Sequence, residues 1–124
     1  VKRQGGMCHY MLPTRRINFE TENVRLNGKY GDEAWELFLR EIRKSNTKPS
    51  EYLVKLFGGS NMFTSVEKSI PDMGVGDKNI DLARQIISDY KLNLVSANLG
   101  GNRARRIHFD VWSGNVWLKR QEND

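Results

Sequence analysis

Apolar residues recur at helical spacing in two segments, about Glu33 to Ser45 and about Lys78 to Tyr90. In each segment they form one stripe that would be buried in a folded protein. Asp32 and Asp77 precede the segments and are the expected N-caps. The spacing therefore predicts two packing helices, with the following stripes: Ala34, Trp35, Phe38, Leu39 and Ile42 in the first, and Ile80, Ala83, Ile86, Ile87 and Tyr90 in the second.

Short apolar runs over 52–57 and 92–99 predict two strands. Further along, Ile107, Phe109 and Val111 alternate with polar residues, which predicts a strand with one buried face. Residues 113–115 then form a turn, and 116–120 return as the second strand of a hairpin. Two helices among several short strands predict an α/β fold: a layered α/β sandwich of mixed, largely antiparallel strands, rather than a doubly wound sheet.

Two stretches between these elements lack periodicity. Residues 14–29 are polar and predict a mobile loop, which is either simply disordered or a contact for a macromolecular substrate. Residues 64–76 predict a second irregular stretch. Its Gly74-Val75-Gly76 does not make a dinucleotide-binding loop, because the third glycine position holds Asn79 and no strand leads in. The length of 124 residues predicts a single domain over 1–124.

Composition narrows the class of protein. No run approaches the roughly 20 apolar residues of a membrane span, and one cysteine cannot form an internal disulfide. With no signal-peptide pattern at the start, we expect a reducing, cytoplasmic setting. The net charge of +5 and pI near 9.5 permit nucleic-acid binding. The basic residues are scattered, however, which is more typical of a solvated surface.

The run from Gly5 to Pro13 carries the candidate chemistry. Its apolar residues predict a strand that ends at Pro13. His9 would then be a titratable group on a rigid element, either a proton carrier or a structural residue. Neighbouring Cys8 would point to the opposite face of the strand, so it cannot act with His9 and is interpreted as a small buried hydrophobe. His108 is expected on a solvent-facing strand position, and these three side chains are too few for a metal site.

Paired glycines adjoin predicted strands at three places: Gly5-Gly6, Gly58-Gly59 and Gly100-Gly101. Glycine allows positive φ and lets another backbone approach closely. Such pairs suit the floor of a cleft that receives a substrate chain, and they equally suit simple turns.

Five motifs occur in order along the chain: GGMCHYMLP, YGDEAWELFLREI, KLFGGSNMF, VGDKNID and LGGNRARRIHFD. Together they resemble the CheD family, the chemoreceptor glutamine deamidases of bacterial chemotaxis, from Gly5 to Leu118. The resemblance implies a layered α/β fold and hydrolysis of receptor glutamine side chains to glutamate and ammonia, without a cofactor. It also implies chemoreceptor cytoplasmic helices as partners, and a CheC-type phosphatase as a further partner.

The resemblance also implies roles for individual residues. His9 matches the family's catalytic base, whereas Asn61, Phe63 and Asn102 match positions at the active face and are expected to contact substrate or a partner. They could also be turn or packing residues. The family's nucleophilic cysteine lies upstream, in a Gly-Ser-Cys turn preceded by a catalytic threonine, and neither feature is in this sequence. We therefore expect a domain that lacks its N-terminal strands. It either acts in a complete enzyme or is an inactive protein-binding module.

Overall fold

The computed structural model describes residues 3–61 and 74–121. The described residues contain two α-helices and four strands, which confirms the α/β class. Phe63 and most of the predicted irregular stretch 64–76 lie outside them. In chain order the elements are α1 (Gly31–Lys44), the short 3-10 helix η1 (Pro49–Glu51), β1 (Leu53–Gly58), α2 (Val75–Asp89), β2 (Asn93–Leu99), β3 (Arg105–Phe109) and β4 (Val116–Arg120).

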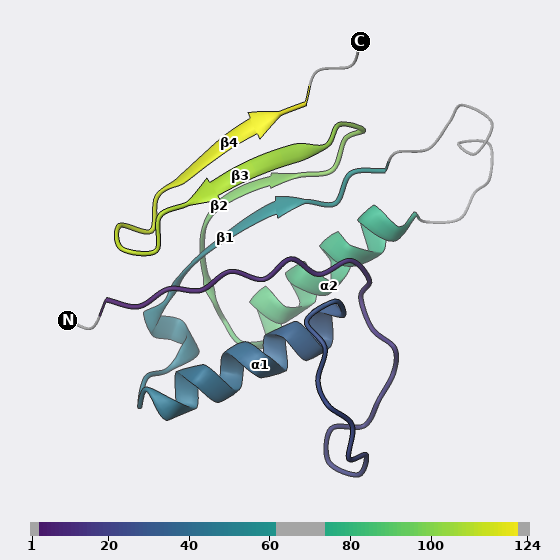
Figure 1. Ribbon diagram of the computed structural model, residues 1–124, viewed down its shortest axis with the longest axis vertical. Helices are drawn as coiled ribbons and strands as arrows, with labels where there is room; N and C mark the ends of the chain where they lie inside the picture. The colour runs from purple at the N-terminus through teal and green to yellow at the C-terminus, as the bar shows by residue number, and fades with distance from the viewer. Residues whose placement is uncertain (1–2, 62–73, 122–124) are drawn as a thin grey trace.

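The strands form one parallel and one antiparallel pair. β1 pairs with β2 in parallel, and β3 pairs with β4 antiparallel. Figure 1 shows the four strands in one layer, with α1 and α2 together on one side of it. Of the described helices, none combines the length and the apolar composition needed to cross a bilayer.

The stripe of α1 is confirmed, and so is that of α2 apart from Tyr90, which follows the helix and is 42% exposed. Ala34, Leu39 and Ile42 of α1 and Ala83 of α2 are the buried apolar side chains of the described residues. Trp35 of α1 packs edge-on against Tyr90, just after α2, with ring centroids 5.1 Å apart. The helix layer is therefore one packed unit.

Both predicted N-caps are wrong. α1 begins at Gly31 after Tyr30, and α2 begins at Val75 after Gly74, in each case without a side-chain cap. Asp32 lies inside the first turn of α1, and Asp77 lies inside that of α2. The physical reason is close packing at two glycines. A Cβ on Gly31 would lie 2.3 Å from the Leu82 side chain, and one on Gly76 would lie 2.4 Å from the Gly59 carbonyl oxygen.

The predicted C-terminal hairpin is confirmed, with one correction at its turn. Gly114, with φ at 78°, donates its N–H to the Asp110 carbonyl oxygen. The Asp110 carboxylate accepts from the Ser113 hydroxyl and the Trp112 N–H, and these bonds lower the pKa of Asp110. Because Asp110 opens the turn, β3 ends at Phe109. Val111 therefore lies outside the strand and is exposed, not on the buried face.

The predicted strand over Gly5–Pro13 is also wrong. The segment has no ladder, and its one bridge joins Leu12 to Tyr30. Strand pairing needs a neighbouring edge, and this segment instead lies against helix residues. Its end is fixed by backbone bonds: the Met11 and Leu12 N–H groups donate to Lys29, and Gly31 donates to Leu12.

Candidate functional site

The segment that carries His9 is tied down at both ends. At one end the Gln4 amide donates to the Tyr52 hydroxyl and accepts from the Ser45 hydroxyl. At the other end the Tyr10 hydroxyl donates to the Asn79 carbonyl oxygen at 2.6 Å, and the Asn79 amide donates to Met11. Figure 1 shows the segment in purple, running alongside β1 and the helices. Because the segment is not paired with a strand, these hydrogen bonds determine the path of its backbone.

The side of the segment on which His9 lies follows from its neighbours. A Cβ on Gly6 would lie 2.9 Å from Phe38 of α1, and Tyr10 reaches α2. Side chains alternate along an extended chain, so the even-numbered residues face the helices and His9 faces away from them. His9 is exposed, between Met7 (59% exposed) and Met11 (60% exposed). No described residue donates a hydrogen bond to its ring, so the imidazole is accessible to a reactant.

Cys8 is not the buried hydrophobe that the sequence predicts. It lies on the helix-facing side of the segment with Gly6 and Tyr10, yet it is a free cysteine that remains exposed. Partial desolvation of the thiol nevertheless raises its pKa. A raised pKa keeps the thiol protonated near neutral pH, and the protonated form is a poor nucleophile. Among the described residues, neither a base nor a positive charge activates the Cys8 thiol.

The turns after β1 and β2 lie together at one corner of the sheet. Gly58, Gly59, Gly100 and Gly101 all have positive φ, between 74° and 117°. The Gly100 N–H donates to Gly58, and the Asn61 N–H donates to Gly101 at 2.9 Å. These bonds bring Asn61 and the exposed Asn102, which follows Gly101, to the same corner. Two of the three glycine pairs therefore provide the backbone conformation that the sequence suggested.

The first two turns of α2 contact both this corner and the His9 segment. Gly76 packs against the Gly59 and Ser60 carbonyls and the Asn61 side-chain oxygen, while Asn79 binds Tyr10 and Met11. The Asn61 side-chain oxygen is buried and lacks a hydrogen-bond partner among the described residues. α2 is therefore the element that fixes Asn61 and His9 relative to each other.

Arg105 braces the same corner, a role that sequence reasoning missed. Its guanidinium donates to the Asn98 side chain, the Ser60 hydroxyl and the Gly100 carbonyl, each at 2.7 Å. Desolvation and then the nearby Arg120 lower its pKa. In the sequence, Arg105 is one of several basic residues in a row, and nothing local separates it from its neighbours.

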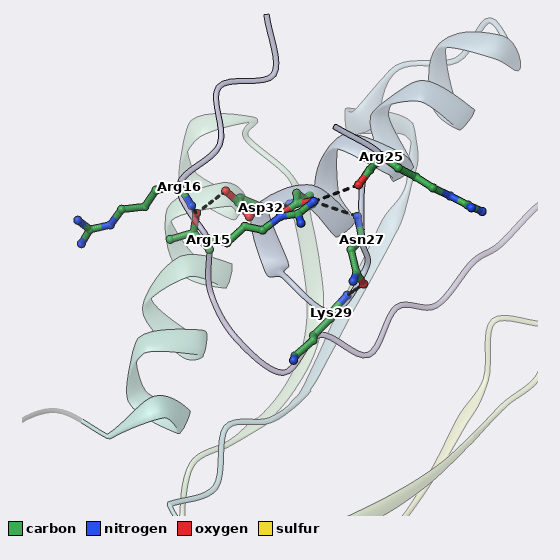
Figure 2. A network of polar contacts seen from close by, with 8 residues as sticks. Arg15, Arg16, Arg25, Asn27, Lys29 and Asp32 are labelled. Carbon is green, nitrogen blue, oxygen red and sulfur yellow. Dashed lines mark hydrogen bonds and ion pairs between the residues drawn. The ribbon is translucent and has the colours of Figure 1, made fainter. Parts of the chain in front are cut away.

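A second missed feature anchors the loop that follows the His9 segment. Glu33 of α1 is fully buried, and its carboxylate binds Arg15 through both oxygens and also accepts from the Asn27 N–H (Figure 2). The same guanidinium donates to the Arg25 carbonyl, and its bond to Glu33 raises the pKa of Arg15. Thr14 donates to Asp32 beside it. The loop 14–29, which the sequence predicts to be mobile, is therefore held against α1.

Together these features define an α/β protein with an accessible histidine on a segment fixed by two helices. Within 3–61 and 74–121, no three His, Cys, Asp or Glu side chains group as metal ligands would. A sequence profile described as CheD chemotactic sensory transduction matches residues 11–120. The chain belongs to the CheD family.

Individual relatives agree with that assignment. The chain is 45% identical to the probable chemoreceptor glutamine deamidase CheD 3 of Dechloromonas aromatica, covering 94% of this chain and 66% of the relative. It is 41% identical to a probable chemoreceptor glutamine deamidase CheD of Pseudomonas syringae pv. tomato, covering 94% and 67%. For the CheD 1 protein of Chromobacterium violaceum the identity is 41%, covering 95% and 59%. The chain thus spans about two thirds of the length of such relatives, or somewhat less.

Proposed function

We propose that this chain, as part of a complete CheD-type protein, hydrolyses glutamine side-chain amides on chemoreceptors. The complete protein means the natural polypeptide that contains these residues. The observation that carries the proposal is the exposure of His9 on a fixed segment, on the side away from the helices. The choice of substrate follows the names of the relatives, which are probable chemoreceptor glutamine deamidases.

The reaction needs a proton carrier at two steps. A thiolate attacks the amide carbon, the resulting oxyanion collapses, and the C–N bond breaks as nitrogen takes a proton and leaves as ammonia. Water then attacks the thioester, gives up a proton, and releases glutamate and the thiolate. A histidine that titrates near neutral pH can receive the thiol's proton, deliver it to the leaving nitrogen and accept one from water. His9 is the residue proposed for this role, and no cofactor is required.

The nucleophile in this proposal is not Cys8. Its raised pKa and the alternation along the segment separate it from His9 in both chemistry and space. The resemblance implies instead a cysteine supplied by upstream polypeptide, which would approach the open side of His9. Asn61, Phe63 and Asn102 are proposed to contact the substrate or a partner. We place the protein in the cytoplasm and include a CheC-type phosphatase among its partners.

The test compares two neighbouring substitutions in the complete protein. The assay incubates it with a purified chemoreceptor cytoplasmic fragment and measures released ammonia, together with glutamate formation by mass spectrometry. General acid–base groups contribute roughly 100- to 10,000-fold to rates, so His9→Ala should lower turnover by at least about 100-fold. Cys8→Ala, one residue away, should leave turnover close to wild type. Near-normal turnover in His9→Ala would remove His9 from the mechanism.

A second candidate function is a protein-binding module without catalysis. It is supported by the residues of this chain, which lack the Gly-Ser-Cys turn of the family and contain one thiol, Cys8, that the proposed mechanism does not use. Such a module would bind receptor helices or a chemotaxis phosphatase without changing glutamine. If the complete protein bound the receptor fragment but released no ammonia, the protein would be a binding module and not a deamidase.

A further inference from the structure

The outward face of the β3–β4 hairpin is strongly basic. Arg106 pairs with Lys119 across the strands, and His108 pairs with Trp117. Directly opposed residues share one face of a sheet, and all four of these side chains are exposed. We call these four residues the hairpin face. It joins two cations, a histidine and a large aromatic side chain on one surface.

The charges on this hairpin are not compensated. Arg106 opposes Lys119, and in the neighbouring pair Arg105 opposes Arg120. Like charges directly opposite each other destabilise a strand pair. Among the described residues, the ion pairs all lie elsewhere, and the one carboxylate of the hairpin turn, on Asp110, is occupied by its own bonds. The hairpin therefore carries an electrostatic cost that an acidic partner would relieve.

The exposed surface of α1 lacks this imbalance. An open hollow of about 680 Å³ lies between the loop 17–20 and α1, where Glu36 pairs with Arg40 and Arg43. At the C-terminal end of α1, Lys44 pairs with Glu41. Acids and bases alternate there as on an ordinary solvated helix. On the hairpin face, by contrast, Arg106 and Lys119 oppose each other and have no ion pair with a described carboxylate.

The face also offers apolar contact. Trp117 is 57% exposed and lies opposite His108, in the pair next to the two cations. Tryptophan is enriched where protein surfaces meet, because its large ring contributes apolar area and a polar edge. Cations beside an exposed aromatic ring match an amphipathic helix that presents carboxylates next to an apolar stripe. Duplex DNA would use the cations and leave the ring without a comparable contact.

We propose that the hairpin face binds an acidic helical segment of the protein substrate. The inference rests on the proposed function, which makes the substrate a receptor built of helices and its product a new glutamate. Same-face residues of a strand are about 6.8 Å apart, close to the 5.4 Å rise of one helical turn. The two cations are instead direct cross-strand partners, with Cβ atoms about 4.5–5.5 Å apart. Acidic residues one helical turn apart can therefore meet Arg106 and Lys119.

The hairpin face is connected to the reacting segment through the hairpin's turn. A Cβ on Gly5, four residues before His9, would lie 3.3 Å from Phe109 and 3.4 Å from the Val111 carbonyl oxygen. An extended chain advances about 3.3 Å per residue, so His9 lies roughly 13 Å further along. Phe109 is on the opposite face of the hairpin from Arg106 and His108. A receptor segment that touches both places would therefore pass around the turn that joins β3 and β4.

The test removes the two cations from the complete protein. Arg106→Gln with Lys119→Gln is compared with Lys78→Gln with Arg84→Gln, which removes the same charge from exposed positions of α2. The probe is a purified chemoreceptor cytoplasmic fragment. Exposed ion pairs contribute about 0.2–1 kcal/mol each, so the hairpin double variant should raise Kd and KM roughly 2- to 30-fold. It should leave kcat unchanged and reduce the salt dependence of binding, whereas the α2 double variant should match wild type.

A variant that keeps the charge gives an independent readout. Trp117→Ala should weaken binding of the receptor fragment by about 10-fold or more, as loss of a central aromatic contact does, without changing the salt dependence. Trp112→Ala is its matched control, because Trp112 is 71% exposed but lies at the turn beneath Arg3. Circular dichroism establishes that both variants are folded. Equal binding by the hairpin double variant and the α2 double variant would overturn the proposal.

Two further outcomes separate this inference from its alternatives. If the hairpin double variant lost affinity for duplex DNA but bound the receptor fragment as wild type does, the face would be a nucleic-acid surface and the proposal would be wrong. If the wild-type protein released no ammonia yet bound the fragment through the hairpin face, the binding inference would stand and the deamidase function would fail.

Discussion

Arg15 holds both carboxylate oxygens of Glu33, with Nε 2.8 Å from Oε2 and Nη2 2.7 Å from Oε1. The Glu33 side chain is fully buried, and that of Arg15 is 31% exposed. One partner belongs to α1 and the other follows the His9 segment by a few residues. The pair therefore links the helix layer to the part of the chain that carries the candidate base.

Substituting Glu33 should destabilise the protein markedly. Glu33→Ala leaves the Arg15 guanidinium and the Asn27 N–H without their acceptor, and breaking a buried pair by removing one partner is strongly unfavourable. We expect Tm to fall by roughly 5–15 °C, as measured by thermal unfolding of the complete protein.

The matched control is Glu36→Ala, one turn further along the same helix. Glu36 contacts Arg40 and Arg43 at 3.5 and 3.8 Å, and both arginines are more than half exposed. Exposed pairs contribute little, so its Tm should change by no more than about 3 °C. An equal fall in Tm in the two variants would show that burial does not make Glu33 contribute more to stability than Glu36.

The helices and the hairpin could be predicted because their signals are local. Apolar spacing within about 15 residues is enough to give α1 and α2, and alternation with a glycine turn is enough to give β3 and β4. The helix starts were missed for a non-local reason. Gly31 and Gly76 allow close approach of residues that are 15 or more positions away in the sequence, and no capping pattern reports that contact.

The sequence proposes a residue for the candidate site but does not predict the contacts that hold it in place. The motif that resembles the family identifies His9, and the structure finds it exposed. Its segment was expected to be a strand, because apolar composition does not reveal whether a partner edge exists. Arg15 and Glu33 are 18 residues apart, and each has an ordinary local interpretation, so their pairing was invisible until the fold brought them together.

Tyr10 should make stability depend on pH in the alkaline range. Burial, and then the charge of Cys8, raises the pKa of Tyr10 from 10.0 to about 12. The folded protein thus holds this proton more tightly than the unfolded chain. The resulting stabilisation is complete below pH 10 and is lost as pH rises from 10 toward 12. We expect a loss of up to ~2 kcal/mol over that range.

The measurement compares urea unfolding of wild type and Tyr10→Phe at several pH values. At pH 8 the variant should be less stable by about 1 kcal/mol, because it lacks the hydrogen bond to the Asn79 carbonyl. Above pH 10 the difference should shrink or reverse, since phenylalanine does not titrate. Parallel curves for the two proteins up to pH 12 would contradict the proposed environment of Tyr10.

Gly76→Ala should be destabilising even though it lies within a helix, where alanine normally gains about 1 kcal/mol over glycine. The added Cβ would lie 2.4, 2.7 and 2.8 Å from the oxygens of Gly59, Ser60 and the Asn61 side chain. Displacing backbone at such a contact costs roughly 1–3 kcal/mol, measurable by urea unfolding. Gly28→Ala, with nothing within 4 Å, is the control. Because the Asn61 N–H binds Gly101, its hydrogen exchange should accelerate in Gly76→Ala alone, and unchanged exchange would mean that α2 does not position this corner.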